Sequence, residues 1–258
     1  MSKTIKNTSI QTEMNHYRIK IKFFLAFFAL IVFIVSSCTS IERHDSHVKS
    51  KTIKSMDRRA KLEEAFVDSV RIGRSGFNKV SIFNYRTEDS NYVDVKFYKK
   101  LGNDWKLIQE LQCSKDGDLG CDPKFADFNQ DGRMDLTIVT AVAARGANQV
   151  RRLFIYDEKR NRLMNMKNSE DYPNMQYNSE LNCIDSWMFH GGVSTVFVRI
   201  IGDSLKEFAW VSLMDKLVVY ETDKNGESNK IFEDASINID DFGFQRFKNY
   251  KPWKIYKD

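Results

Sequence analysis

The chain has 258 residues, of which 42% are hydrophobic and 29% charged, and this length and balance suffice for one sizeable core. The net charge of +5 is concentrated at the N-terminus, since the first 37 residues hold five basic residues and one acidic residue. The rest of the chain is nearly neutral and contains no basic block of the kind that contacts phosphates. The composition therefore indicates a globular protein and argues against disorder, a coiled coil and nucleic-acid binding.

The first expected element is an export signal. Thirteen apolar residues, 23–35, follow three basic residues and precede two serines and Cys38. A membrane-spanning helix needs about 20 apolar residues, whereas the hydrophobic region of a signal peptide needs about 7 to 15. Residues 35–38 resemble the bacterial lipoprotein box, whose cysteine thiol accepts diacylglycerol. The resemblance implies a signal peptide over residues 1–37 and lipidation of Cys38; the alternative is an ordinary signal peptide or an anchor helix with an incidental cysteine.

Lipidation would hold the mature protein at a membrane, because each buried methylene contributes about 0.8 kcal/mol and several acyl chains make the anchor permanent. Thr39 follows the cysteine, and the sorting rule of bacterial lipoproteins then implies the outer membrane of a Gram-negative bacterium. Residues 38–60 lack proline and glycine, contain few apolar side chains and carry charges of both signs, which predicts a solvated tether. Residues 61–258 are then expected to form one folded domain.

Strands are expected along most of this domain, because apolar and polar side chains alternate with a period of two. In residues 92–98, for example, Val93, Val95 and Phe97 share one face. The later expected strands cover residues 105–113, 136–142, 150–156, 195–201, 208–213 and 217–221. Short polar connectors join them without an amphipathic helix, so the predicted fold class is an all-β antiparallel meander. Only residues 61–70 predict a short helix.

An acidic loop precedes the strand over residues 136–142. Its oxygen atoms at positions 1, 3, 5, 7 and 9 come from Asp127, Asn129, Asp131, the backbone carbonyl of Arg133, and Asp135. Gly132 at position 6 permits the turn that brings alternate residues around one centre, and Ca²⁺ takes six to eight oxygen ligands. The pattern therefore predicts a calcium loop. It is not an EF-hand, because position 12 is Ile138 rather than glutamate.

The calcium ion needs a further oxygen ligand besides these five. It is supplied by the second carboxylate oxygen of Asp135, by Asp118 or Asp122, or by a water molecule. The alternative interpretation of the loop is an acidic turn without an ion.

Residues 123–136 resemble the strand, calcium loop and strand of FG-GAP and VCBS repeats, which build β-propellers. The wider order, with residues 105–109 before the loop and 153–157 after it, is similar to a family of Gram-negative periplasmic lipoproteins with an incomplete propeller. The similarity covers roughly residues 92–222 and implies a partial β-propeller that binds calcium through the five residues above. Some members inhibit lysozyme-like peptidoglycan hydrolases, including as immunity proteins.

Three cysteines remain besides Cys38, and an exported protein encounters an oxidising compartment. Cys113 ends an expected strand and Cys121 precedes the calcium loop. We expect a disulfide between them, which would close a short loop and stabilise the fold by about 2 to 3 kcal/mol. Cys183 lies in an apolar run and is expected to be buried rather than reactive.

The sequence contains no phosphate-binding glycine loop, zinc-protease motif or nucleophile elbow. His190 is the one histidine of residues 61–258, where it is either a general base or, as we expect, a loop or core residue. Carboxylate pairs of the glycosidase type stay open, because spacing along the chain does not give their separation in space. We therefore expect no enzymatic activity.

The predicted function is that of a calcium-stabilised binding module, an inhibitor or immunity protein against a lysozyme-like peptidoglycan hydrolase. The alternative is an envelope enzyme or a glycan-binding accessory lipoprotein. Partner contacts are expected on loops, with Arg145 in residues 143–149 and His190 in residues 190–194. Arg145 would pair with a carboxylate of the hydrolase, and the alternative is a solvated arginine.

Overall fold

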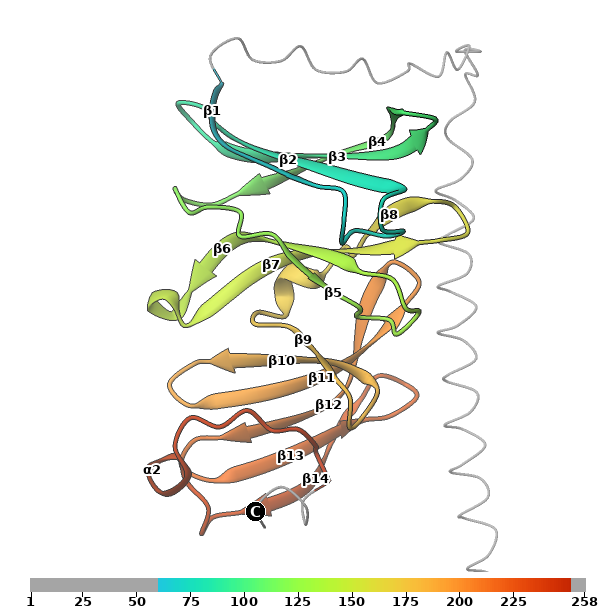
Figure 1. Ribbon diagram of the computed structural model, residues 1–258. Coiled ribbons are helices and arrows are strands. Elements are labelled where there is room, and N and C mark those ends of the chain that lie inside the picture. Colours follow the sequence, from blue (N-terminus) through green and yellow to red (C-terminus); the bar gives the residue numbers. More distant parts are fainter. Residues whose placement is uncertain (1–59, 252–258) are drawn as a thin grey trace, which may run out of the picture. The chain divides into compact units, whose positions relative to one another are not determined.

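A computed structural model of the chain describes residues 60–251, without the side chain of Asp241 (Figure 1). The expected signal peptide, Cys38 and nearly all of the expected tether lie outside these residues. The described residues belong to one compact unit. Within residues 60–251, no helix has the length and hydropathy that crossing a membrane requires.

The described strands form three antiparallel sheets in which neighbouring strands are also neighbours in sequence. Sheet 1 consists of β1 (Lys61–Asp68), β2 (Asn78–Arg86), β3 (Asn91–Leu101) and β4 (Asp104–Lys115). Sheet 2 consists of β5 (Lys124–Ala126), β6 (Asp135–Ala143), β7 (Asn148–Asp157) and β8 (Arg162–Asn165). Sheet 3 consists of β9 (Gln176–Asn178), β10 (Cys183–Phe189), β11 (Val193–Ile201), β12 (Ser204–Leu213), β13 (Leu217–Thr222) and β14 (Ser228–Asp234).

Helical structure in the described part is limited to η1 (Ala144–Gly146), η2 (Ser169–Asp171) and α2 (Ile239–Phe242). The prediction of an all-β antiparallel meander is therefore confirmed. The described strands close neither a barrel nor a propeller.

The three sheets lie one above another, and sheet 2 is covered on both faces (Figure 1). In β7, Phe154 and Tyr156 pack with sheet 1 in a first core. Leu153 and Ile155 point the other way and pack with sheet 3 in a second core. This double burial explains why residues 153–156 form a continuous apolar run, since a strand buried on both faces needs no polar side chains.

Residues 61–68 form a strand, so the prediction of a helix over residues 61–70 is wrong. The strand β1 pairs antiparallel with β2 at the edge of sheet 1, and Phe66 packs against the first core. Leucine, glutamate, lysine and alanine favour a helix in isolation, but pairing with a neighbouring strand and burial of an aromatic ring outweigh that weak preference.

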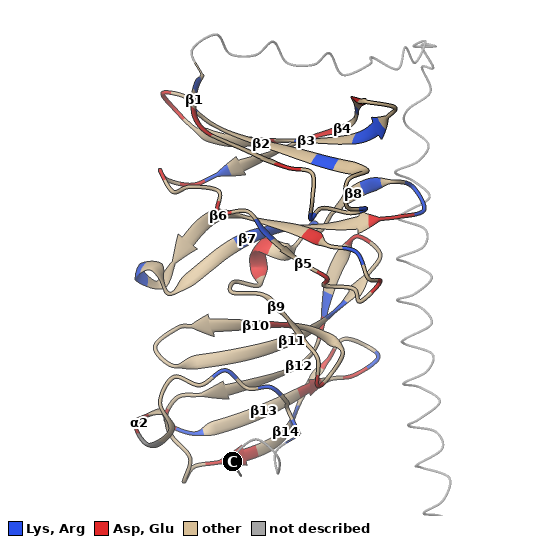
Figure 2. Cartoon of the chain, in the orientation of Figure 1, with Lys and Arg blue, Asp and Glu red and all other residues tan. Residues whose placement is uncertain are grey.

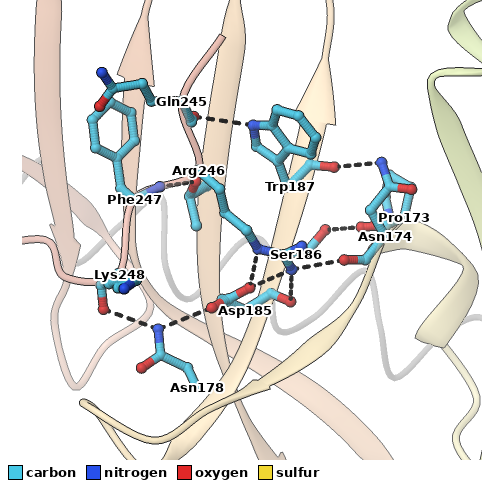
Figure 3. A network of polar contacts seen from close by, with 11 residues as sticks. Pro173, Asn174, Asn178, Asp185, Ser186, Trp187, Gln245, Arg246, Phe247 and Lys248 are labelled. Atoms are coloured by element: carbon cyan, nitrogen blue, oxygen red, sulfur yellow. Dashed lines mark hydrogen bonds and ion pairs between the residues drawn. The ribbon is translucent and has the colours of Figure 1, made fainter.

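A third core lies on the outer face of sheet 3, where residues after β14 cover the sheet. Phe247 and Tyr250 pack there against side chains that include Phe197 and Val211. A polar network fastens this C-terminal segment, and its centre is Arg246 (Figure 3). The Arg246 Nε donates to the Asp185 carboxylate at 2.7 Å, and its Nη2 donates to a backbone carbonyl of the same residue at 3.1 Å.

Asn178 and Trp187 extend the network. The Asn178 amide donates to Asp185 at 2.9 Å and to the Lys248 carbonyl at 2.9 Å, and the Trp187 indole donates to the Gln245 carbonyl at 3.0 Å (Figure 3). The C-terminal segment is therefore held by directional bonds as well as by apolar packing.

Candidate functional site

The predicted calcium loop connects β5 to β6 and is shaped by its own side chains. The Asp127 carboxylate accepts the backbone N–H of Gly132 at 2.8 Å and that of Asp131 at 3.2 Å. The Asp131 carboxylate accepts the N–H of Arg133 at 2.8 Å and the side-chain amide of Asn129 at 3.0 Å. Gly132 has φ +82°, which a residue without a Cβ adopts without strain. Asp127, Asn129 and Asp131 thus converge within one turn.

Asp135 starts β6 at the end of this loop and is fully buried. Its carboxylate accepts the backbone N–H of Phe128 and that of Tyr156, each at 2.8 Å. Burial raises the pKa of Asp135 to about 7, and the negative charges of Asp131 and Asp127 act in the same direction. The two hydrogen bonds lower the pKa by a smaller amount. Asp135 therefore links the loop to β7 through these two hydrogen bonds.

The chemistry of the donors fits a hard cation. None of Asp127, Asp131 and Asp135 forms an ion pair with a lysine or arginine within residues 60–251, and the Arg133 guanidinium bonds to Glu158 instead, at 3.0 Å. A cation would offset the mutual repulsion of these carboxylates. No group of three or more His, Cys, Asp or Glu side chains in the described part is arranged to hold a metal. A bound ion would therefore depend on the Asn129 amide and the Arg133 carbonyl as well.

The two further aspartates considered as calcium ligands form ion pairs with arginines outside the loop. Asp118 pairs with Arg86 at 2.8 Å. Asp122 pairs with the nearly buried Arg151 at 3.0 Å, and this arginine also bonds to the Thr137 hydroxyl at 3.0 Å. Arg151 was not singled out from the sequence, because nothing in the run around it distinguishes a buried arginine from a solvated one. It ties the segment before β5 onto β6 and β7.

The three cysteines within residues 60–251 are free, buried thiols. Cys113 and Cys121 lie in the first core and interact electrostatically, and burial raises their pKa values to about 11 and about 12. Their disulfide stays a prediction. Cys183, the first residue of β10, is buried in the third core, as expected.

The structure brings the neighbourhoods of Arg145 and His190 together. The Asn148 side chain accepts the backbone N–H of Phe189 at 2.9 Å and donates to its carbonyl at 3.0 Å, which joins the start of β7 to the end of β10. In Figure 1, η1, the β10–β11 turn and α2 all lie on the left side of the body. We call the surface formed by residues 143–149, residues 190–194, Met214, Phe189 and Phe244 the loop edge.

Arg145 is presented by a strained turn. Ala144 has φ +48° and Arg145 has φ +55°, and each non-glycine residue in this left-handed conformation costs about 1 to 2 kcal/mol. Arg145 is exposed and forms no ion pair within the described residues. Figure 2 shows charges of both signs spread over the three sheets, with a basic turn at η1.

His190 is exposed, and a hydrogen bond of 2.6 Å joins its Nε2 to the Ser194 hydroxyl. Ser194 is only 6% exposed, and no carboxylate of residues 60–251 orients the imidazole by a hydrogen bond. The pair therefore lacks two features of a nucleophile and its base, namely access for a substrate and an orienting group.

Apolar side chains lie beside these loops. Trp187 and Phe189 have ring centroids 4.3 Å apart, and the Phe189 and Phe244 centroids are 5.6 Å apart. Phe244 is 62% exposed and Met214, which contacts Gly192, is 40% exposed. Exposed apolar groups gathered at one edge are typical of a surface that binds another molecule.

No family model matches the chain, and no curated protein matches it either. Among solved structures, one described as a Xanthomonas type IV secretion system related protein is similar to 67% of this chain and 96% of its own length. The identity of the two chains is 10%, and the TM-score is 0.41.

Proposed function

We propose that this protein is a lipid-anchored protein of the bacterial envelope, directed to the outer membrane. Its three-sheet body would be a non-enzymatic binding module that calcium stabilises. Its partner would be a lysozyme-like peptidoglycan hydrolase, which it inhibits, either in self-protection or as an immunity protein. The resemblance of residues 123–136 to FG-GAP and VCBS repeats supports the calcium-binding module, and the lipoprotein box at Cys38 supports the anchor.

The main support for the proposed partner surface is the strained turn of Ala144 and Arg145, which exposes the Arg145 side chain. Two adjacent left-handed residues oppose folding, and strain of this kind persists where a side chain is held for binding or catalysis. Arginine and aromatic side chains are enriched where interfaces gain most of their affinity, and Phe189 and Phe244 lie on the same loop edge. Lysozyme-like hydrolases cleave glycosidic bonds with two carboxylates, which an arginine complements in charge.

Purified protein is expected to slow peptidoglycan lysis by a cognate lysozyme-like enzyme, and Arg145→Ala to weaken the inhibition about tenfold or more without lowering the melting temperature. The loss reflects one charge-assisted hydrogen bond of about 1.5 to 3 kcal/mol. Lysis assays with a titration of each variant measure it. Ala144→Gly should relax the turn and weaken inhibition while leaving the arginine in place.

Arg160→Ala is the matched control, because Arg160 is an exposed arginine in the β7–β8 turn, outside the loop edge. It should inhibit like the unaltered protein. Absence of inhibition across lysozyme-type and lytic-transglycosylase-type enzymes would contradict the proposed partner, and turnover of a glycan or peptide would favour the enzymatic alternative.

Cys38→Ser is expected to leave the precursor without lipid, because serine offers no thiol for a thioether. Growth with labelled fatty acid, followed by isolation of the protein, measures this directly. Label incorporated equally into the serine variant would show that another residue accepts the lipid.

A further inference from the structure

We propose that the β3–β4 hairpin is a membrane contact of the folded body, which inserts its apolar turn among anionic phospholipids and binds their phosphates with lysines. We call residues 98–107, together with Lys79 of β2, the basic hairpin. It contains four lysines and one acidic residue, Asp104. The β3–β4 turn lies on the right of Figure 1 and the loop edge on the left. The inference therefore rests on the proposed envelope location and is independent of the proposed hydrolase.

The lysines of the basic hairpin have no carboxylate partner, since none of the four forms an ion pair within residues 60–251. Lys96 lies farther from the turn on β3 and differs, because it pairs with Glu110 at 2.9 Å. Lys99 and Lys106 are direct partners in the antiparallel register, and like charges in this position oppose strand pairing. Phosphate groups beside these two lysines would offset that repulsion.

The lysines lie on both faces of the hairpin. Lys99 and Lys106 share one face, and the register places Lys79, Lys100 and Trp105 on the other. There the Lys79 Nζ is 5.1 Å and the Lys100 Nζ 6.0 Å from the centroid of the Trp105 ring. A protein or glycan docked on the sheet would meet one face alone. Cations on both faces instead suit a turn that enters a layer of phosphates end-on, with each ammonium group remaining at the level of the headgroups.

Apolar side chains are exposed at the turn end of the hairpin. Leu101 is 50% exposed and Leu107 is 43% exposed. Phe77, which is 65% exposed, lies beside them, because its carbonyl accepts the Lys100 N–H at 2.9 Å. The indole N–H of Trp105 donates no hydrogen bond within the described residues. Tryptophan is enriched at membrane interfaces, where its ring contacts apolar chains and its N–H meets the headgroups.

Charge and shape together select an anionic bilayer as the occupant. The register pairs Leu101 with Asp104, so the tip consists of Gly102 and Asn103 alone and is narrow enough to enter the headgroup region. Burial of the exposed leucine and aromatic side chains in the membrane interface favours insertion. Each lysine near an anionic surface strengthens binding about fivefold, so the four lysines make the contact depend on the lipid charge.

A fluorophore on the turn tests the contact in the full-length chain. Asn103→Cys is combined with Cys38→Ser and labelled with a dye that senses polarity, because the cysteines of the described residues are buried. The emission should shift to the blue with vesicles of equal parts phosphatidylglycerol and phosphatidylcholine, and not with phosphatidylcholine alone. Salt at 1 M should reverse most of the shift, since it shortens the Debye length to about 3 Å. Apolar residues 23–35 do not affect this readout, because the dye reports on the hairpin alone.

Substitution of the opposed lysines tests the role of charge. Lys99→Gln/Lys106→Gln should lower the ratio of membrane-bound to free hairpin about 25-fold. Its melting temperature should equal or exceed that of the unaltered protein, because the two charges repel each other. Lys206→Gln/Lys224→Gln is the matched control, since both lysines are exposed, lie outside the basic hairpin and form no ion pair within the described residues. It should leave the shift intact.

Three results would overturn the proposal. The first is a shift of equal size with both kinds of vesicle, and the second is no shift with either. The third is a shift that polyglutamate produces equally without vesicles, which would assign the lysines to an acidic polymer. Since Cys38→Ser cannot be lipidated at that position, none of these results depends on the lipid anchor, which the fatty-acid label tests separately.

Discussion

Replacing Arg246 with leucine is expected to lower the free energy of unfolding by about 3 to 5 kcal/mol, because it leaves the Asp185 carboxylate buried without its cation. Asp185 is 2% exposed, and Arg246 is its ion-pair partner within the described residues. The same guanidinium donates to the Asn174 carbonyl at 2.7 Å, so the substitution also leaves a carbonyl without a donor. The C-terminal segment over the third core should loosen first.

Chemical denaturation of Arg246→Leu and of the double variant Asp185→Asn/Arg246→Leu measures this effect. The double variant should recover much of the loss, because a neutral amide is far less costly to bury than a lone charge. Arg160→Leu, which removes an exposed arginine, should change the stability little. A single variant as stable as the unaltered protein would show that the pair contributes little.

The loss should also depend on pH. Burial already raises the pKa of Asp185, and removal of Arg246 raises it further, because the arginine acts to lower it. A carboxyl whose pKa is higher in the folded than in the unfolded state binds more protons when folded, so its contribution to stability is lost as pH rises through the folded pKa. The free energy of unfolding of Arg246→Leu should therefore be closest to that of the unaltered protein near pH 4, and the difference should grow as the pH rises.

The hydrophobic pattern of the sequence located β3, β6, β7 and β11 to within a few residues. In β3, apolar residues face a core at every second position, whereas β6, β7 and β11 contain runs of consecutive buried residues. The alternation did not identify β1, because the residues of β1 also favour a helix, and only the partner strand β2 decides between the two structures.

Polar residues that act across the fold could not be predicted in the same way. Asp185 and Arg246 are 61 residues apart, and Gln109 and Leu163 are 54 residues apart. A single glutamine or arginine has no periodic pattern, so only the packing of the sheets shows which backbone group or charge it meets. The calcium loop differs, because its expected ligands lie within nine consecutive residues and their order in the sequence already implies their convergence.

The position of that loop gives calcium a large expected effect on stability. The Met134 carbonyl accepts the Gly73 N–H at 3.1 Å, and Asp135 accepts the Tyr156 N–H, so the loop contacts both the β1–β2 connector and β7. An ion that fixes the loop would therefore stabilise the junction of sheets 1 and 2. Because it binds the folded state alone, a hundredfold excess over Kd adds about 2.7 kcal/mol to the free energy of unfolding.

Addition of calcium to metal-stripped protein is accordingly expected to raise the melting temperature by about 5 to 10 °C, and Asp131→Ala should abolish most of this increase. Asp131 also accepts two hydrogen bonds within the loop, so the variant is compared with itself with and without calcium rather than with the unaltered protein. Asp118→Ala is the control, because that aspartate pairs with Arg86 and should leave the calcium response intact. The metal content of the stripped protein is measured first. If it is nil and calcium leaves the melting temperature unchanged, residues 127–135 are an acidic turn that is held in place by its own backbone hydrogen bonds.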